Sequence, residues 1–256
     1  MAAMSDLRVG KAGQQLPLVA KYRRYWLPEV VIVLLILTVA TGLCLLYPVD
    51  LGLARWFYRP LGVGRSWPYG ELQPWKLLNK ADAALTFLLA GIALVLLLLG
   101  FLRPKWRLFR LYAAFILLSL MIGPGLLVNG VFKDHWGRPR PREVKEFGGC
   151  LAYRPPLLKG DGPGRSFPSG HAAVAFDYLV FWFIWRRKRR LAVPALLGGL
   201  GLGGVMGIAR FTAGAHFLSD VIWSAGLTYL VSLILYYFIL RIPQREDDWH
   251  NAEYSR

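Results

Sequence analysis

The run Lys133-Asp-His-Trp-Gly-Arg-Pro-Arg-Pro141 opens a polar loop that separates two apolar stretches of the chain. The loop closes on Phe167-Pro168-Ser169-Gly170-His171, where the next apolar stretch begins. Concentrated positive charge beside an apolar helix, followed by a Ser-Gly-His helix start, predicts a site for an anionic group. The basic residues of the first part of the loop are Lys133, Arg138, Arg140, Arg142 and Lys145.

The composition around this loop is that of a membrane protein. Of the 256 residues, 55% are hydrophobic and only 18% are charged. A net charge of +16 would suggest nucleic-acid binding in a soluble protein. Because much of this charge lies in short segments between apolar runs, anionic lipid headgroups and the positive-inside rule explain it better. The apolar runs exclude a soluble nucleic-acid-binding protein.

Six apolar stretches approach the roughly 20 residues that a membrane-spanning helix needs. We therefore predict an all-α polytopic membrane protein, with a basic tail over 1–26, a six-helix domain over 27–240 and a polar tail over 241–256. Gly123-Pro124-Gly125 loosens the third span, and the fourth is only about 15 residues long. The predicted spans are 27–47, 83–102, 111–132, 171–185, 191–208 and 217–240.

The distribution of Lys and Arg predicts the orientation of these spans. The short turns 103–110 and 186–190 and the N-terminal tail are strongly basic, so the positive-inside rule places them and both termini in the cytoplasm. The connector 48–82, in which residues 50–58 suit a short interfacial helix, then shares the outer face with the loop 133–170 and the junction 210–216. These outer segments are also basic, which the rule does not predict, so a function has to account for their charge.

The first of three candidate clusters is Lys133, followed after six residues by Arg140-Pro141. A Lys ammonium is a compact charge and an Arg guanidinium a planar fork, so together they suit a tetrahedral oxyanion. Pro139 and Pro141 stiffen the backbone around Arg140. A polybasic anchor for anionic lipids would show the same pattern, and this cluster alone does not separate the two.

The second cluster is Pro168-Ser169-Gly170-His171. A Ser hydroxyl, a Gly that lets a ligand approach the backbone, and the free N–H groups of a helix N-terminus form an anion site. His171 could donate a proton to a leaving oxygen. Taken alone, the cluster fits an ordinary helix cap with an interfacial His better.

The third cluster is Arg210, His216 and Asp220. On a helix, residues 216 and 220 would share a face, so we expect Asp220 to fix the tautomer of His216 and leave the other ring nitrogen free to attack. Arg210 adds a third cation for the anion. A satisfied polar pair within the membrane is the alternative, although ionisable residues at membrane depth are expensive and tend to be functional.

Together, three cations, an anion-binding helix start, two His and one Asp on the same side predict phosphoryl transfer with a His nucleophile and a His acid. This set resembles the signature of the type 2 phosphatidic acid phosphatase family, over roughly residues 111–235. The family pattern is Lys-x6-Arg-Pro, Pro-Ser-Gly-His and Ser-Arg-x5-His-x3-Asp, and Ala209 stands where it has Ser. The matching segments are Lys133…Arg140-Pro141, Pro168-Ser169-Gly170-His171 and Ala209-Arg210…His216…Asp220.

The resemblance implies a role for each matching residue. His216 would form a phosphohistidine, Asp220 would orient it, and His171 would protonate the leaving alcohol and later activate water. The family needs no metal or other cofactor. Arg138 also precedes a Pro, but its spacing from Lys133 does not fit the pattern, so no role is assigned to it. The implied phosphate-binding residues are Lys133, Arg140, Ser169, Gly170 and Arg210.

The implied function is metal-independent hydrolysis of a lipid phosphate at the outer face of a bacterial inner membrane. Undecaprenyl diphosphate, phosphatidylglycerol phosphate, phosphatidic acid and lipid A are all candidate substrates, and the basic outer face favours a multiply charged headgroup such as lipid A. We expect the connector 48–82 and the loop 145–167 to choose among them. A lipid-to-lipid phosphotransferase and a non-catalytic lipid-binding or transport protein stay open, as does the oligomeric state.

Overall fold

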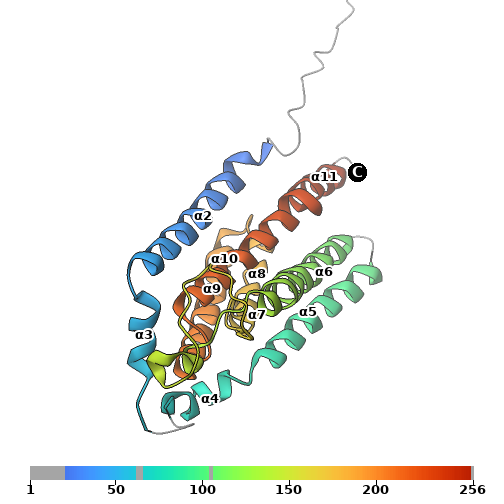
Figure 1. Ribbon diagram of the computed structural model, residues 1–256. Coiled ribbons are helices and arrows are strands. Elements are labelled where there is room, and N and C mark those ends of the chain that lie inside the picture. Colours follow the sequence, from blue (N-terminus) through green and yellow to red (C-terminus); the bar gives the residue numbers. More distant parts are fainter. Residues whose placement is uncertain (1–20, 62–65, 104–105, 255–256) are drawn as a thin grey trace, which may run out of the picture.

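The computed structural model describes residues 21–61, 66–103 and 106–254, and every regular element in these ranges is a helix (Figure 1). The all-α prediction is confirmed for this part of the chain. Most of the predicted basic tail, residues 1–20, lies outside the described residues.

Five helices in the described ranges are long and apolar enough to cross a bilayer, and each matches a predicted span to within a few residues. The third is α6 (Arg107–Leu120) continued by η3 (Met121–Lys133), and the last is α10 (Leu218–Ile234) continued by η6 (Leu235–Ile239). The others are α2 (Arg23–Leu46), α5 (Asp82–Leu102) and α9 (Arg189–Thr212).

The loosening predicted at Gly123-Pro124-Gly125 takes the form of a π-helix, η3, in the second half of the third span. Pro124 has no backbone N–H to donate, so the regular hydrogen-bond ladder cannot pass through it. The Asn129 side chain donates to the Pro124 carbonyl at 2.7 Å. The wider turn thereby places Asn129 and Lys133 at the end of the helix that carries the predicted site.

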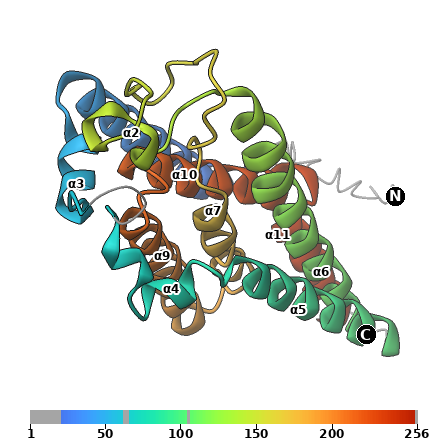
Figure 2. The same ribbon diagram turned by 60° about the horizontal axis from the view of Figure 1, so that its bottom comes forward.

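The predicted fourth span consists of two short helices, α7 (Gly170–Asp177) and α8 (Val180–Ile184), of 8 and 5 residues. They lie inside the bundle, where α7 contacts α5, α9, α10 and η3 (Figure 2). The neighbouring helices bury most of α7, so little of this helix faces lipid. Because this segment is shorter than the five long helices, the count of six spans stays a prediction.

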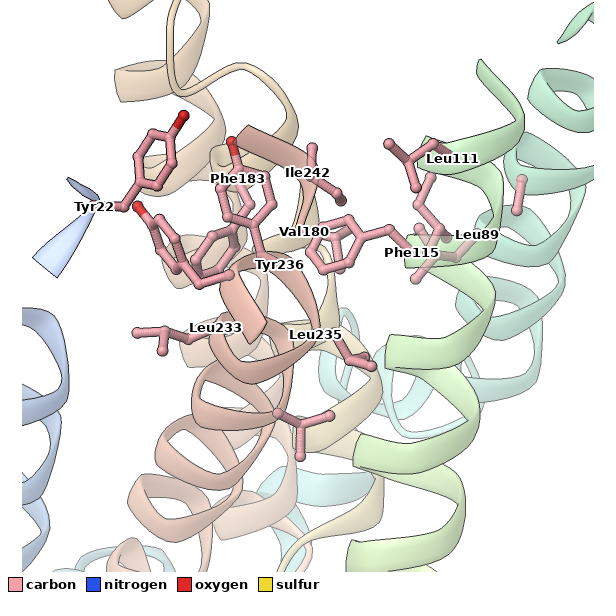
Figure 3. Close-up of a cluster of buried hydrophobic side chains, with 14 residues drawn as sticks. Tyr22, Leu89, Leu111, Phe115, Val180, Phe183, Leu233, Leu235, Tyr236 and Ile242 are labelled. Carbon is pink, nitrogen blue, oxygen red and sulfur yellow. The ribbon is translucent and has the colours of Figure 1, made fainter. Parts of the chain in front are cut away.

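The largest core cluster lies toward the end of the bundle where α2 begins and α11 (Ile242–Tyr254) packs. Figure 3 shows its aromatic centre, where the rings of Phe183 and Tyr236 lie 5.3 Å apart. At this end the Asp247 carboxylate accepts from Lys21 at 2.7 Å and from Arg187 at 2.6 Å. The predicted polar tail over 241–256 contains α11, which these contacts and the buried Ile242 hold against the bundle.

The opposite end of the bundle gathers the connector and the polar loop (Figures 1 and 2). The expected short helix is α3 (Val49–Phe57), and the backbone N–H of Arg142 donates to the Gly214 carbonyl at 3.1 Å. Segments 48–82, 133–170 and 210–216 thus lie at one end of the bundle, and the prediction that this end is the outer face stays a prediction. The short elements here are η1 (Pro68–Glu71), α4 (Trp75–Leu78), η4 (Pro141–Glu143) and η5 (Lys145–Phe147).

Candidate active site

His216 lies at the centre of the polar end of the bundle, and its side chain is almost fully buried. Its Nδ1 is 2.7 Å from the Ser166 carbonyl and 3.7 Å from Oδ2 of Asp220. Burial lowers the pKa of His216 to about 4, against the opposing effect of Asp220. A carbonyl only accepts hydrogen bonds, so the neutral ring carries its proton on Nδ1 and leaves the Nε2 lone pair free.

Asp220 occupies the first turn of α10, and His216 precedes that helix. The expectation that the two residues share a helical face was wrong, because Phe217 is the N-cap and its backbone N–H donates to Asp220 Oδ2 at 2.8 Å. Asp220 also accepts from the Ser166 hydroxyl at 2.6 Å. Ser166 thus contacts both residues and adds a second link between Asp220 and His216 beside their direct approach.

Arg138 is the main site residue that sequence reasoning left without a role. Its side chain is fully buried and pairs with two carboxylates, Asp220 and Asp50, the latter at 2.7 Å. Burial by itself would lower the pKa of Arg138, but these two carboxylates raise it above its ordinary value. Arg138 further donates to the Ser219 hydroxyl at 2.8 Å and to the Arg154 carbonyl at 2.8 Å.

Asp50 ties the connector to this network. It lies in the first turn of α3, is fully buried, and accepts from the backbone N–H of Ser219 at 2.9 Å, at the start of α10. An acid at the start of a connector helix was visible in the sequence. The buried carboxylates of Asp50 and Asp220 need a cation to compensate their charge. Arg138 lies in the polar loop, which the predicted topology places on the same side as both.

The predicted phosphate-binding cations come together beside His216. Lys133, Arg140 and Arg210 lie close enough for their charges to repel one another, and Lys133 donates to Asn129 Oδ1 at 3.2 Å. Arg210 lies in the last turn of α9 rather than in a loop, and it donates to Asn79 Oδ1 at 3.0 Å. The Nε atoms of Arg140 and Arg210 are buried without a hydrogen-bond partner among the described residues. Unpaired buried donors on repelling cations favour binding of an anion.

Ser169 and Gly170 begin α7 as predicted. The Ser169 hydroxyl is the N-cap acceptor for Ala172, and the Ser169 backbone N–H donates to the Asp220 carbonyl at 3.3 Å. A Cβ on Gly170 would lie 2.5 Å from Asn129 Oδ1. A side chain at this position would therefore displace the Asn129 amide, which also contacts Lys133.

His171 faces the same cluster from the first turn of α7. Its charge interacts with those of Lys133, Arg210 and His216, and its Nε2 lies 3.5 Å from the Asp82 carboxylate. Asp82, at the start of α5, had no predicted role. A carboxylate beside an imidazole stabilises the protonated ring. All eight predicted site residues thus lie in one cluster at one end of the bundle.

Two further observations bear on the chemistry of this cluster. Ala209, at the position where the family pattern has Ser, is fully buried, and its carbonyl accepts from the Thr212 hydroxyl at 2.8 Å. Within the described residues, no group of three or more His, Cys, Asp and Glu side chains is placed to hold a metal ion. The groups gathered around His216 are instead a buried neutral base, cations and hydrogen-bond donors, which suits transfer of a phosphoryl group.

Residues 111–243 match the PAP2 superfamily. The chain belongs to this superfamily. A lipid A 4'-phosphatase of Francisella tularensis subsp. novicida is 37% identical over 59% of this chain and 69% of its own length. A lipid A 4'-phosphatase of Rhizobium leguminosarum is 36% identical over 53% and 56%, and a lipid A 1-phosphatase of Rhizobium etli is 32% identical over 46% and 47%. The chain thus spans about half the length of the two rhizobial proteins. No solved structure gives a match.

The predicted family is confirmed, and with it the enzyme class. The chain is a multi-pass membrane protein and a lipid phosphatase. The match to the superfamily contains every predicted site residue, since these extend from Lys133 to Asp220.

Proposed function

We propose that this phosphatase removes the 4'-phosphate of lipid A at the outer face of a bacterial inner membrane, through a phosphohistidine on His216. The main support for this proposal is the free Nε2 of a buried, neutral His216 beside three cations. Two of these cations, Arg140 and Arg210, have a buried nitrogen without a hydrogen-bond partner among the described residues. A neutral imidazole is a nucleophile, and the cations would neutralise the charge that develops on the transferring phosphoryl oxygens.

The reaction runs in two displacements. Nε2 of His216 attacks phosphorus, the bond from phosphorus to the lipid oxygen breaks, and His171 gives a proton to that oxygen. Water then attacks the phosphohistidine, His171 takes a proton from it, and inorganic phosphate leaves with the P–N bond broken. Lys133, Arg140 and Arg210 hold the phosphoryl oxygens throughout. The nearby Asp82 carboxylate offsets part of the effect of burial and of the neighbouring cations, which disfavour the protonated form of His171.

Two observations support lipid A as the substrate. Relatives of this chain carry the name lipid A 4'-phosphatase, and the strongest of these matches covers more than half of the chain. The polar end of the bundle also carries basic residues beyond the three cations of the site, including Arg142, Arg165 and Lys80. Such an end suits a headgroup with more than one negative charge.

Phosphate release from lipid A by the purified protein, measured with EDTA present, tests the proposal. His216→Ala and His171→Ala should each lower kcat by a factor on the order of 1000 or more, because each removes a group that forms or breaks bonds. A brief reaction with labelled substrate should leave acid-labile label on the wild type and none on His216→Ala. Full rates in both variants would refute the assignment.

The same assay separates hydrolysis from lipid-to-lipid transfer. With labelled lipid A and an unlabelled acceptor lipid present, hydrolysis releases all of the label as free phosphate. Label in the acceptor lipid would identify a phosphotransferase that uses the same residues.

A further inference from the structure

A large cavity opens beside Arg210 at the polar end of the bundle. Its volume is about 1300 Å³, far more than a phosphate group needs and enough for a large ligand. One wall comes from the connector, and the other comes from the loop after Arg140. The lining includes Tyr58, Trp67, Lys80, Arg142, Phe147 and Arg210.

Close packing fixes the connector wall against the chain that follows Arg210. A Cβ on Gly70 would lie 2.8 Å from the Cα of Ala213, so η1 touches that backbone directly. Gly214 has a φ of +57°, and a Cβ there would overlap the Trp67 ring. Only Gly combines this left-handed conformation with the approach of the indole. The position of the wall relative to the site is therefore set by two points of contact.

Three aromatic rings, two from the connector wall and one from the loop wall, pack on one another and hold the two walls together. The ring centroids of Tyr58 and Trp67 lie 5.7 Å apart, those of Trp67 and Phe147 5.5 Å, and those of Tyr58 and Phe147 5.2 Å. Phe147 itself is buried. The three rings come from the connector and from the loop 145–167, the two segments expected to select the substrate. Aromatic faces of this kind pack well against the apolar faces of sugar rings.

The charges that line the cavity are mostly positive and incompletely neutralised. Glu71 pairs with Lys76 at 3.0 Å, and the Glu143 carboxylate accepts from the backbone N–H of Arg140 at 2.8 Å. Lys80 and Arg142 are exposed, and no carboxylate oxygen of a described residue lies within 4.0 Å of either charged group. The two cations are therefore available to an anionic ligand.

Arg210 joins the cavity to the site around His216. It lies in the candidate phosphate-binding cluster and also lines the cavity, and Asn79, another lining residue, accepts from its Nη1 at 3.0 Å. The charge of Arg142 also interacts with that of Arg210. A headgroup whose scissile phosphate contacts Arg210 can thus extend into the cavity toward Lys80 and Arg142.

We propose that this cavity is a subsite for the sugar portion of a glycolipid headgroup, and that Lys80 and Arg142 bind a second phosphate of the same headgroup that is not cleaved. One relative of this chain is named a lipid A 4'-phosphatase and another a lipid A 1-phosphatase. These names imply that lipid A carries a phosphate at each of the two positions. The inference rests on the proposed function, because the scissile phosphate has to occupy the cluster around His216.

Three substrates and four proteins test the subsite. The substrates are lipid A with both phosphates, lipid A without the 1-phosphate, and phosphatidic acid. The proteins are the wild type, Lys80→Gln/Arg142→Gln, the matched control Lys145→Gln and His216→Ala. Lys145 is an exposed cation of the same end that does not line the cavity. Phosphate release gives kcat and KM, and melting temperatures confirm that the variants fold.

The double variant should raise KM for doubly phosphorylated lipid A about tenfold or more, the loss expected for charge-assisted contacts. Its KM for the other two lipids should change less than threefold, and Lys145→Gln should match the wild type on all three. Equal changes on all three lipids, or no change on any, would overturn the subsite while the proposed function stands. A wild type that releases phosphate from none of the lipids would overturn the proposed function and the subsite with it.

Discussion

At the residue scale, the site depends on one buried guanidinium shared by two buried carboxylates. Arg138 pairs with Asp50 of the connector and with Asp220 of α10, and all three side chains are fully buried. Removing one partner of a buried ion pair costs about 3–5 kcal/mol, because the other charge is left without compensation. Arg138 therefore joins the connector, the polar loop and the helix behind His216.

We predict that Arg138→Met lowers the free energy of unfolding by at least about 3 kcal/mol. It should also lower kcat on the order of 100-fold with little change in KM, since Ser166 and His216 shift while the phosphate-binding cations stay. Thermal unfolding in detergent and steady-state kinetics measure the two effects. The exposed Arg142→Met is the stability control and should unfold like the wild type; an Arg138→Met protein as stable as that control would contradict the prediction.

Burial of His216 predicts a specific dependence on pH. Its pKa is lowered to about 4, so the folded protein does not take up this proton between about pH 6.5 and 4, whereas the unfolded chain does. The stability contribution is present above pH 6.5 and is lost as the pH falls through 4, at a cost of about 3 kcal/mol. Melting temperatures from pH 7 to 4 should fall less steeply for His216→Gln than for the wild type. Equal slopes would place the His216 pKa near its ordinary value.

At the element scale, α10 carries a polar stripe into the bundle. Asp220, Ser224, Thr228 and Ser232 recur every fourth residue and are all fully buried. Near the middle of the bundle the stripe meets Ser119 of α6, whose hydroxyl lies 2.8 Å from that of Ser232. Because lipid offers no alternative partners, such contacts hold membrane helices together, each contributing about 0.6–2 kcal/mol.

Asp177, the last residue of α7, adds a carboxylate to the contact between Ser119 and Ser232. It accepts from the Ser119 hydroxyl at 2.5 Å, while its Oδ2 is buried without a partner among the described residues. Asn keeps the accepting oxygen and removes the buried charge, so Asp177→Asn should be at least as stable as the wild type. Asp177→Leu should lose about 1–2 kcal/mol with the hydrogen bond. If thermal unfolding shows equal losses in both variants, the charge itself is needed.

The residues that the sequence could predict are those whose spacing carries the chemistry. Lys133, Arg140, His171 and His216 follow a motif, and the apolar runs place them at one end. Their supporting partners could not be predicted, because the roles of these partners arise only from packing between distant segments. The supporting residues are Asp50, Asn79, Asp82, Asn129 and Arg138.

Local backbone detail also lay beyond the sequence pattern. The spacing of His216 and Asp220 suggested one helix, but the helix starts between them, after the N-cap Phe217. Likewise, the charged stretch 241–256 has no apolar periodicity, and its helix is held by ion pairs to Lys21 and Arg187, far away in the chain. In both places, contacts formed after the chain folds decide the local structure.

At the scale of the whole molecule, the two ends of the bundle differ in chemistry. The site, the cavity and the polar loop that carries Cys150 lie at one end, and the contact between Arg187 and Asp247 lies at the other. Since His171 is at the first end and Arg187 at the second, α7 and α8 together connect the two ends of the bundle. This path supports six crossings with both termini on the same side.

Labelling of single cysteines by a membrane-impermeant maleimide tests this topology. Cys150 is exposed and Cys44 is buried, so in intact cells with a permeabilised outer membrane the unmodified chain should react at Cys150. In a Cys150→Ser background, Lys188→Cys and Arg245→Cys should react only after the inner membrane is opened. If Lys188→Cys reacted from the same side as Cys150, α7 and α8 would not cross the membrane. If the sides were reversed for all three positions, six crossings would stand but the site would face the cytoplasm, where the positive-inside rule places only the basic turns.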